Sequence, residues 1–291
     1  MTGKYTMDYW ETVAGPKWVH SQAPLDALLA PFAEPLQPVI SNHGTGHIID
    51  VGCGCGATTL LARETAPDAR ITALDVSRPM LDLAKSRVRT SGDTQTRFIH
   101  GDASAHPIEP GSVDLLISRF GLMFFSDPVA AFAHMGRWLS PGGTMSFMVW
   151  GAPADNHWLA DPLAALAHHL PDPTAPGTGP GPFAFASADH RAEVFGAAGL
   201  KVLAAESVIR PVIIDGTIEQ RMGFYAERGP ILAALEASTP EQAEAIHADL
   251  RAWVESVSVA ERITLQAAAV HITLRTAATT SAAETDPSAS R

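Results

Sequence analysis

The residues whose types and spacing could do chemistry lie in one short segment, HIIDVGCGCGATTLLA, at 47–62. An apolar run ends in Asp50, and three glycines follow it at two-residue spacing: Gly52, Gly54 and Gly56. This pattern predicts a strand, a tight glycine loop and a helix N-terminus, an arrangement that lets a ligand approach the backbone closely. A carboxylate just before the loop would repel a pyrophosphate and attract an ammonium group. The segment therefore predicts a site for a small molecule that carries positive charge.

Two further acids follow predicted strands, at Asp75 and Asp102. Open α/β folds bind ligands at the carboxyl ends of their parallel strands, so we expect both acids to line the same sheet edge as Asp50. Asp75 does not distinguish between ligands, because an acid there binds the ribose diol of NAD and of S-adenosylmethionine (SAM) alike. Asp50 stands where NAD folds usually carry an apolar residue, and Asp102 could accept a hydrogen bond from an adenine amino group. The two acids favour SAM, which carries an ammonium and a sulfonium group.

Composition narrows the class of protein and of partner. The chain of 291 residues is 46% hydrophobic, which is enough for one large domain with a sizeable core. Acidic residues outnumber lysine plus arginine by 31 to 20, so no nucleic-acid partner is expected. We find no signal-peptide pattern and no apolar run of membrane-spanning length, and therefore expect a cytoplasmic protein without a membrane partner. Cys53 and Cys55 are expected to be reduced, because they are too close in sequence for an ordinary disulfide.

Helix and strand patterns alternate from residue 16 to residue 150, which predicts a parallel sheet with helices on both faces. The SPGG sequence at 140–143 predicts a turn between the last helix and the last strand of this part. Helices are expected at 16–32, 57–64, 79–89 and 128–139, and strands at 47–51, 70–75, 96–100, 113–118 and 144–150.

The pattern changes beyond Trp150, where the proline- and glycine-rich segment 171–182 cannot form regular structure. Helices are expected here at 156–170, at 188–198 and over 217–258, and strands at 201–214 and 263–276. The chain is thereby divided into an N-terminal helical lead-in or lid (1–45), a SAM-binding core (46–150), a cap insert with a helix (151–200), the last two strands with the helical insertion 217–258 (201–276) and a disordered tail (277–291).

Five segments together resemble the class I SAM-dependent methyltransferases, especially the group that includes the ubiquinone/menaquinone-biosynthesis methyltransferases: IIDVGCGCG, ALDVSRPML, FIHGDA, VDLLISRFGLMFF and LSPGG. The resemblance covers roughly residues 46–150, and the lead-in YWETVAGPKWV is similar to that of some bacterial members. It implies an α/β fold with a doubly wound, mostly parallel, seven-stranded Rossmann-like sheet and a helical cap. One of the last two strands is expected to be antiparallel, at or near the sheet edge.

The resemblance implies that the glycine loop holds the methionine and ribose parts of SAM. Asp50 would orient the methionine amino group, directly or through water. The backbone of Gly52 and Gly54 would allow the methionyl-ribose region close contact. Thr58 or Thr59, near the helix start, could reach the SAM carboxylate, although either side chain could instead cap the helix.

The resemblance also implies that the next two strand ends hold the nucleoside. Asp75 would bind both ribose hydroxyls. Val76 and Met80 would pack on the adenine ring, although Met80 also suits a plain core position. Asp102 would accept from the adenine amino group, and the Ala103 N–H would donate to another ring nitrogen.

The transferring methyl group is expected to face Ser118 and Arg119, which end the fourth strand. Arg119 could hold a carboxylate of SAM or of the acceptor, or form an ion pair within the lid. Trp18 is the remaining expected cofactor contact, because an aromatic ring can attract a sulfonium and exclude water. The candidates for the acceptor site, each of which could also pack in the core, are Tyr9, Trp10, His20, Phe120, Met123, Phe124, Asn156, Trp158, Phe183, Phe185 and Tyr225.

The expected reaction is an in-line SN2 displacement that moves the methyl group of SAM to an O, N, S or C nucleophile of a small molecule. Positioning alone can lower such a barrier by about 7–11 kcal/mol. A general base is needed only when the nucleophile arrives protonated, and His157 is the most base-like candidate. No metal site is expected, and His168 and His169 should point in different directions on a helix.

Three alternatives stay open at this point. One is a SAM-binding enzyme that no longer transfers methyl, such as a cyclase or decarboxylase. Another is an NAD-dependent oxidoreductase, because Gly52-x-Gly54-x-x-Ala57 also fits a loose dinucleotide pattern. The third is a SAM-dependent scaffold without catalysis. The acceptor, its attacking atom and the oligomeric state, monomer or homodimer, are not fixed by the sequence.

Overall fold

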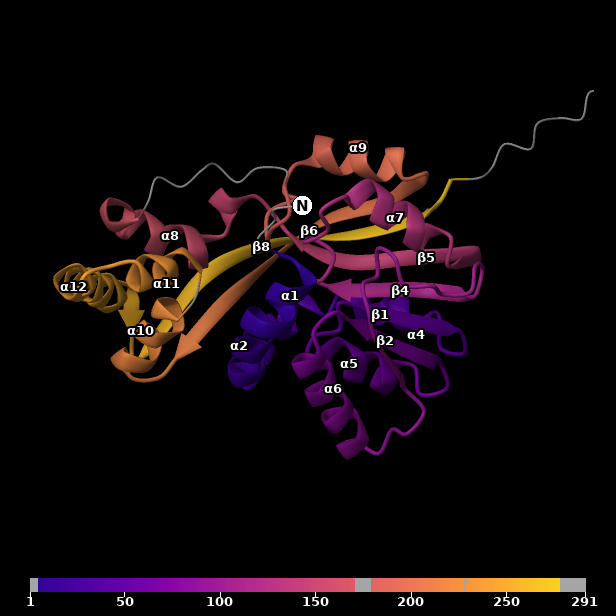
Figure 1. Cartoon of the computed structure of the whole chain (residues 1–291), viewed down its shortest axis with the longest axis horizontal. Coiled ribbons are helices and arrows are strands. Elements are labelled where there is room, and N and C mark those ends of the chain that lie inside the picture. Colours follow the sequence, from indigo (N-terminus) through magenta and orange to yellow (C-terminus); the bar gives the residue numbers. More distant parts are fainter. Residues whose placement is uncertain (1–4, 171–178, 228, 278–291) are drawn as a thin grey trace, which may run out of the picture.

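A central sheet of strands organises the computed structural model, which describes residues 5–170, 179–227 and 229–277 (Figure 1). Its main path has the strand order β3-β2-β1-β4-β5-β8-β6, and β7 pairs with β8 outside this path. The strands are β1 (His47–Val51), β2 (Arg70–Asp75), β3 (Arg97–His100), β4 (Val113–Arg119), β5 (Leu139–Trp150), β6 (Leu200–Asp215), β7 (Ser258–Val259) and β8 (Arg262–Thr276).

The first five strands are parallel, and β8 is antiparallel to both of its main neighbours, β5 and β6. The expected fold class, an α/β sheet with seven strands on its main path and one antiparallel strand next to the edge, is confirmed. All five residues of β1 are buried. A strand buried on both faces reads as a continuous apolar run, which explains why HIIDV lacks the alternation of a half-exposed strand.

Helices cover both faces of the sheet. In Figure 1, α7 and α9 lie above the strands and α4, α5 and α6 lie below them. The helical elements are α1 (Met7–Tyr9), η1 (Trp10–Ala14), α2 (Gly15–His20), α3 (Gln22–Leu29), η2 (Ala30–Phe32), α4 (Leu36–Ser41), α5 (Ala57–Thr65), α6 (Arg78–Thr90), α7 (Pro128–Gly136), η3 (Pro153–Asp155), α8 (His157–Ala165), η4 (Ala167–His169), α9 (Ala188–Ala197), α10 (Ile218–Ala226), α11 (Gly229–Glu236) and α12 (Pro240–Val257).

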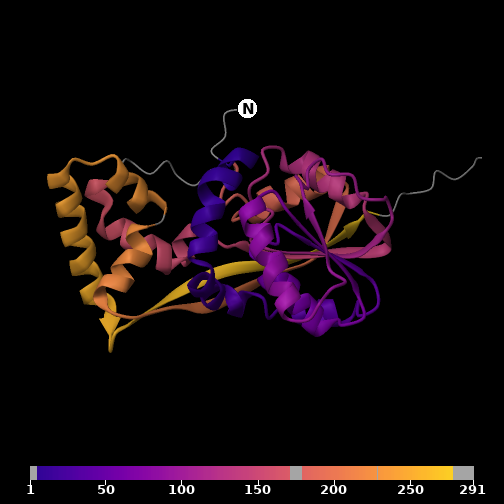
Figure 2. The ribbon, with the colours of Figure 1, turned by 60° about the horizontal axis from the view of Figure 1, so that its bottom comes forward.

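Strands β6 and β8 form a long antiparallel ribbon that leaves the sheet and carries α10, α11 and α12 at its far end (Figures 1 and 2). Helix α12 packs against α8, so the two helical segments beyond residue 150 come together. The strands predicted at 201–214 and 263–276 are therefore the last two members of the sheet, and 217–258 is a helical insertion between them.

Three predicted elements were wrong in their bounds. The helix expected at 16–32 is broken at Ser21, whose φ of −99° and ψ of 19° leave the helical region. The SPGG sequence lies within β5 rather than in a turn before it. The register between β4 and β5 shifts here, because Val113 pairs with Leu139 and Leu115 pairs with Thr144. The SPGG residues lie between these two pairs. The helix expected at 156–170 ends at Ala165, because Leu166 adopts a φ of −102° and a ψ of 11°. Residues 171–178 and 278–291, where irregular structure was expected, lie outside the described residues.

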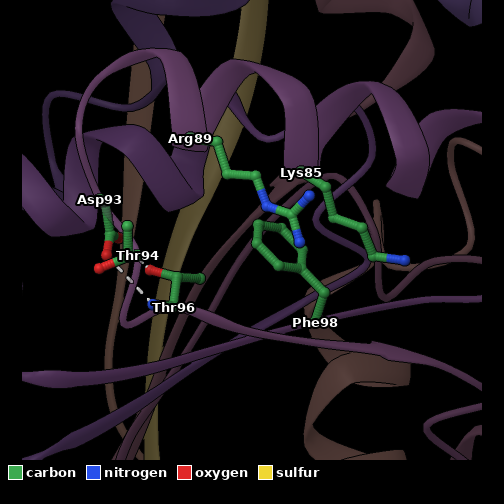
Figure 3. A pocket seen from close by; sticks show the side chains of 6 residues that line it. All are labelled: Lys85, Arg89, Asp93, Thr94, Thr96 and Phe98. Carbon is green, nitrogen blue, oxygen red and sulfur yellow. Dashed lines mark hydrogen bonds between the residues drawn. The ribbon is translucent and has the colours of Figure 1, made fainter.

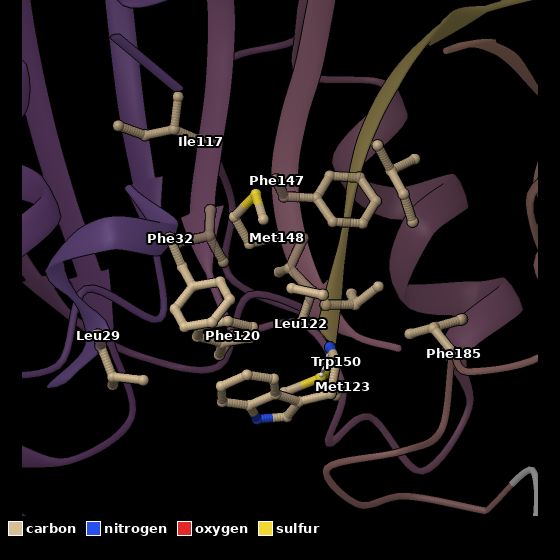
Figure 4. Close-up of a cluster of buried hydrophobic side chains, with 14 of the residues drawn as sticks. Leu29, Phe32, Ile117, Phe120, Leu122, Met123, Phe147, Met148, Trp150 and Phe185 are labelled. Atoms are coloured by element: carbon tan, nitrogen blue, oxygen red, sulfur yellow. Dashed lines mark hydrogen bonds between the residues drawn. The ribbon is translucent and has the colours of Figure 1, made fainter. Parts of the chain in front are cut away.

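Aromatic side chains fill the core below the carboxyl edge of β4 and β5. The rings of Phe120 and Trp150 stack with centroids 3.9 Å apart, and Phe32 packs edge-on against both at 5.7 Å and 5.3 Å. Figure 4 shows these rings beside Leu122 and Met123. This cluster fixes the ends of two central strands, which form part of the edge described next.

Candidate active site

The carboxyl edge of the sheet brings together the three acids that the sequence predicts there. Asp50 lies in β1, Asp75 ends β2, and Asp102 follows β3, which are neighbouring parallel strands. The charge of Asp75 contributes to the raised pKa of Asp50, as expected for two close carboxylates. The topology therefore places the acids as expected, while their roles toward a ligand are not tested by the fold.

Asp50 is fully buried, and only one of its two carboxylate oxygens accepts a hydrogen bond from a described residue. The Thr59 hydroxyl donates a hydrogen bond of 2.6 Å to Asp50 Oδ2, but Oδ1 has no donor within the described part of the chain. Burial raises the pKa of Asp50 to about 7, because the charged form loses solvation. A buried acceptor without a donor costs free energy, so Oδ1 is a place where a ligand could supply the missing bond.

The glycine loop requires the absence of side chains. Gly52 has a φ of +67°, and a Cβ added there would lie 2.8 Å from the Gly121 Cα. Gly56 has a φ of +87°, and its Cβ would lie 2.9 Å from the Ala84 Cβ. Only glycine combines this left-handed backbone with such close contacts. The loop therefore passes between the segment that follows β4 and helix α6.

Asp75 ties the glycine loop to the start of α6. Its Oδ2 accepts a hydrogen bond of 2.7 Å from the Gly54 N–H, and its Oδ1 accepts one of 2.8 Å from the Ser77 N–H. Burial raises the pKa of Asp75, while these backbone bonds act in the opposite direction. Asp75 thus has a structural task in addition to any contact with a ribose, since each carboxylate oxygen can accept more than one bond.

The residues expected to hold an adenine ring follow β2 and β3. Met80 and Ala103 are buried, and Val76 is half-buried. Asp102 is half-buried, and its Oδ1 accepts a hydrogen bond of 2.8 Å from the Ser104 N–H. All four residues thus lie just beyond the carboxyl ends of two neighbouring strands.

Arg119, at the end of β4, is mostly buried and forms an ion pair with Asp26 of the lead-in helix α3, the alternative expected for it. Its Nη2 lies 3.8 Å from Asp26 Oδ1, while the other oxygen of Asp26 is 2.7 Å from Arg87 Nη2. Burial lowers the pKa of Arg119, and the charges of Asp26 and, to a smaller extent, Asp50 oppose this effect. Ser118, also buried, accepts a hydrogen bond of 3.3 Å from the Gly121 N–H. Arg119 remains a candidate for a carboxylate contact.

The N-terminal helices α1, η1 and α2 lie against the carboxyl edge. Glu11 Oε2 accepts a hydrogen bond of 2.8 Å from the Arg78 N–H and lies 3.4 Å from His100 Nε2. A Cβ at Gly15 would overlap the Ser77 hydroxyl, so α2 and the start of α6 are in direct contact. The lead-in therefore lies where it was expected, beside the carboxyl ends of β2 and β3.

The lead-in also approaches the helical insertion. Lys17 Nζ on α2 lies 3.9 Å from Glu236 Oε1 on α11, and both side chains are exposed. Trp10 meets Phe124 edge-on with ring centroids 5.0 Å apart, and Tyr9 meets Trp10 at 5.8 Å. The structure thus joins three of the expected acceptor-site aromatics in one cluster.

Several predicted residues have structural surroundings instead. Phe120, with a φ of 62°, and Met123 are buried in the core, as is Phe185. Asn156 donates hydrogen bonds to the carbonyls of Ala152 and Ala268 at 2.9 Å and 3.0 Å. Its Oδ1 accepts from the Ala268 N–H, so its hydrogen-bonding groups are used to hold α8 on β8. The expectation that Asn156 binds the acceptor is not favoured by this arrangement.

Other predicted residues lie apart from these contacts. Trp18 is 36% exposed, and His20 is exposed on the same helix. His157 is 47% exposed, and its Nδ1 lies 3.1 Å from Asp161 Oδ1 one helical turn away. Trp158 packs against Trp150 with ring centroids 5.5 Å apart. Phe183 is partly buried against the core.

Sequence reasoning missed several residues that shape the edge. Glu11, Asp26, Ser77 and His100 have no motif that distinguishes them from ordinary surface or cap residues. Thr59 was expected, like Thr58, only as a contact of the SAM carboxylate or as a helix cap, and its hydrogen bond to Asp50 was not predicted. These residues are positioned by contacts between distant segments, which the spacing of residues along the sequence does not reveal.

His168 and His169 were expected to point apart, which is wrong. Both Nε2 atoms contact Asp249 Oδ2, at 3.0 Å and 2.8 Å. The two residues lie in the 3₁₀ turn η4 rather than in an α-helix, and their rings face the same acid on α12. One ligand atom from each of the three residues lies within 4.8 Å of the others, a spacing that could hold a metal ion.

A cavity of about 220 Å³ lies away from the carboxyl edge, between the last turns of α6 and the start of β3 (Figure 3). It is lined by Lys85, Arg89, Asp93, Thr94, Thr96 and Phe98. In Figure 3 the Arg89 guanidinium lies beside the Phe98 ring. Because β3 begins here and ends near Asp102, this cavity is at the opposite end of the strand from the acids.

Comparison with known proteins adds a family resemblance to this geometry. A family model described as a methyltransferase domain matches residues 48–143. The demethylmenaquinone methyltransferase of Thermus thermophilus is 32% identical over 106 residues, which make up 36% of this chain and 48% of that protein. The malonyl-[acyl-carrier protein] O-methyltransferase of a Paenibacillus species is 29% identical over 126 residues, or 41% of this chain and 46% of that protein.

The expected resemblance to class I SAM-dependent methyltransferases is thereby confirmed over the glycine loop and the first strands. The chain matches about half the length of these two curated relatives. The crystal structure of the [4+2]-cyclase SpnF superposes with a TM-score of 0.54 over 91% of this chain and 96% of that chain, at 19% identity. At this identity the likeness shows the fold alone. No helix in the described ranges is long and apolar enough to cross a membrane.

Proposed function

We propose that this protein is a SAM-dependent methyltransferase that moves a methyl group to a small-molecule acceptor by in-line displacement. One observation carries the proposal: Asp50, fully buried beside the glycine loop, has an oxygen without a donor among the described residues. An ammonium group would supply that donor and stabilise the charged form of the carboxylate. The methyltransferase-domain resemblance over residues 48–143 supports the same conclusion.

The residues present fit SAM. Asp50 would hold the amino group, with the Gly52 and Gly54 backbones beside the methionyl chain and Arg119 or Thr58 near the carboxylate. The ribose and adenine would be held by Asp75, Val76, Met80, Asp102 and Ala103, with Ser118 and Trp18 as further contacts. Bound SAM supplies an electrophilic methyl group on its sulfonium.

The chain's own contribution is positioning and exclusion of water. Asp50 in β1 and Asp75 at the end of β2 would hold the amino group and the ribose at fixed positions. The lead-in is held on this edge by Glu11 and by the contact of Gly15 with Ser77, and its aromatic cluster would shield the reacting groups from water. Helices α8 and α10–α12 would cover the acceptor from the other side.

The acceptor is proposed to be a small molecule in the cytoplasm rather than a nucleic acid. The excess of acidic over basic residues disfavours binding to phosphate backbones. Cys53 and Cys55 are free thiols in the structure, as suits a reducing compartment.

Isothermal titration calorimetry with S-adenosylhomocysteine and with NADH tests the cofactor. We expect S-adenosylhomocysteine to bind in the micromolar range and NADH not to bind; the reverse result would reject the proposal. Incubation with methyl-labelled SAM and a small-molecule extract then tests transfer. A labelled small molecule supports the methyltransferase, whereas SAM binding without any labelled product supports one of the enzymes that have lost transfer.

A further inference from the structure

A buried arginine in the helical insertion has no counter-ion among the residues that the structure describes. Arg221 lies on α10 and is only 5% exposed. Neither its Nε nor its Nη1 has an acceptor among the residues that the structure describes. The mostly buried Arg63, by contrast, has Asp93 beside it at 2.8 Å. A buried charge without a partner is costly, so such a group usually has a ligand or an ion pair.

A second unsatisfied donor lies one helical turn away. Tyr225 is also 5% exposed, and its hydroxyl has no hydrogen-bond partner in the described ranges. Residues four apart lie on the same helix face, so Tyr225 and Arg221 are neighbours. The Tyr225 ring packs edge-on against Trp253 of α12, with ring centroids 4.9 Å apart. Burial raises the pKa of Tyr225, so its hydroxyl stays protonated and can donate.

Two acids near this helix have other partners. Asp161 on α8, whose charge also raises the pKa of Tyr225, pairs with His157 at 3.1 Å. Glu219 on α10 itself lies 3.3 Å from Arg251. Neither of these two acids balances the charge of Arg221.

The pair lies on the same side of the sheet as the candidate active site but beyond it. Strand β6 runs parallel to β5, because both are antiparallel to β8. Ala269 pairs with Trp150 at the end of β5 and also with Val208 of β6. From Val208 the strand continues to Asp215, which at about 3.3 Å per residue places the end of β6 roughly 20 Å beyond Val208, and α10 follows from there and packs against β6. The two donors thus lie in the helical insertion, apart from the acids of the carboxyl edge.

We propose that Arg221 and Tyr225 form a binding site for the oxyanion of a small molecule, a carboxylate or a phosphate. Guanidinium N–H groups and a phenol O–H together match the acceptors of such a group, and its negative charge would neutralise the buried cation. The oxyanion could belong to a free ion or to the charged end of a longer molecule. If the longer molecule is the methyl acceptor, that identification rests on the proposed function.

Calorimetric titration of the full chain with sodium phosphate, octanoate and octanamide tests the site. We expect at least one of the two anions to bind and the neutral amide not to bind. Arg221→Met should weaken anion binding at least tenfold, and Tyr225→Phe about three- to tenfold. Arg251→Met removes the same charge from an exposed position in the same insertion and should leave binding unchanged. Failure of both anions to bind the wild type, or equal binding by Arg221→Met, would overturn the proposal.

Thermal unfolding in a buffer without phosphate or carboxylate gives a second readout. Arg221→Met keeps an apolar stem and removes an unpaired buried charge, so its Tm should equal or exceed that of the wild type. A Tm below that of Arg251→Met would mean that Arg221 has an internal partner, and the proposal would be wrong. Added anion should raise the Tm of the wild type and not that of Arg221→Met.

The same samples distinguish the two sources of the oxyanion and test the proposed function independently. Binding of phosphate but not octanoate indicates a free ion, and the reverse indicates the end of a longer molecule. S-adenosylhomocysteine should bind the wild type and Arg221→Met equally. If it binds neither, the methyltransferase proposal fails while the anion titrations still decide this one.

Discussion

Thr59 and Asp50 share a buried hydrogen bond of 2.6 Å, which satisfies one carboxylate oxygen and leaves the other without a donor in the described structure. The bond favours the charged carboxylate, but burial acts more strongly and raises the pKa of Asp50 to about 7. Near neutral pH the residue is therefore divided between a neutral acid and an anion that can bind an ammonium group.

The first prediction concerns the pH dependence of cofactor binding. The ammonium group of S-adenosylhomocysteine pairs with the ionised form of Asp50, so affinity should rise as the pH increases from about 6 to 8. The increase approaches tenfold per pH unit below the pKa and levels off above it. Calorimetric titrations at a series of pH values measure this profile, and Asp50→Asn should bind weakly with a flat profile.

Protein stability without ligand should change with pH in the opposite direction. The folded-state pKa of about 7 lies above the unfolded value near 3.8, so the folded state binds the additional proton between these limits. Stability from this residue is fully present below about pH 4 and is lost as the pH rises through about 7. The total is on the order of 4 kcal/mol. Urea unfolding of wild type and Asp50→Asn should diverge over this range; parallel curves would contradict the raised pKa.

The second prediction separates two adjacent threonines. Thr59→Val removes the donor to Asp50, so the pKa of Asp50 should rise further and the binding profile should shift to higher pH. Thr58→Val is the matched control, because Thr58 is buried on the same helical turn and is not the donor to Asp50. Titrations of both variants check this, and equal shifts would show that the bond to Thr59 has no special effect.

The third prediction concerns Asp75. Asp75→Ala removes the acceptor for the Gly54 and Ser77 N–H groups and, in the proposed complex, for the ribose hydroxyls. Charge-assisted bonds contribute about 1.5–3 kcal/mol each, so S-adenosylhomocysteine should bind at least tenfold more weakly, and stability should also fall. Asp82→Ala removes an exposed acid of α6 as a control. If Asp75→Ala binds S-adenosylhomocysteine with wild-type affinity, Asp75 has only the structural role of holding the glycine loop.

The fourth prediction tests the docked lead-in. Gly15→Ala introduces a methyl group that overlaps the Ser77 hydroxyl and the Trp10 carbonyl, so α2 must move away from α6. We expect weaker cofactor binding with an intact sheet, because no strand includes Gly15. Hydrogen exchange of residues 5–20 with and without S-adenosylhomocysteine measures the docking. Gly196→Ala, where nothing lies within 4 Å, should behave like the wild type. Unchanged protection in Gly15→Ala would argue against a covering role.

The fifth prediction concerns His157. Loss of a general base typically lowers kcat by about 10²–10⁴-fold. His157 is exposed and paired with Asp161 on the same helix, so His157→Gln should change turnover of methyl-labelled SAM less than twofold. A loss of a hundredfold or more with unchanged SAM binding would restore His157 as the base.

Local patterns predicted the carboxyl edge of the sheet well. The strand over Arg70–Asp75 and the loop from Asp50 to Gly56 follow from apolar runs, strand-end acids and glycine spacing, all of which lie within a few residues of one another. The strands β6 and β8 could also be predicted from the sequence, because both segments are rich in β-branched residues.

The rest depended on partners far away in the chain. Asn156 looked like a polar ligand contact, but its bonds go to Ala268, 112 positions later. Phe120 looked like an acceptor wall, but it stacks on Trp150. No local rule shows that Gly15 must meet Ser77. Residue type suggested chemistry in each case, and the packing of distant segments decided the role.

The β6–β8 ribbon has an evolutionary consequence. It joins the parallel strands only through the pairing of β8 with β5, and its far end carries α10, α11 and α12. The helices at that end can therefore be lengthened, replaced or recombined between lineages without altering the register of the strands that carry Asp50 and Asp75. Sequence likeness to curated relatives is strong around 48–143, before the ribbon begins. The architecture is that of a fixed handle with an exchangeable head, in which new specificities can arise by grafting.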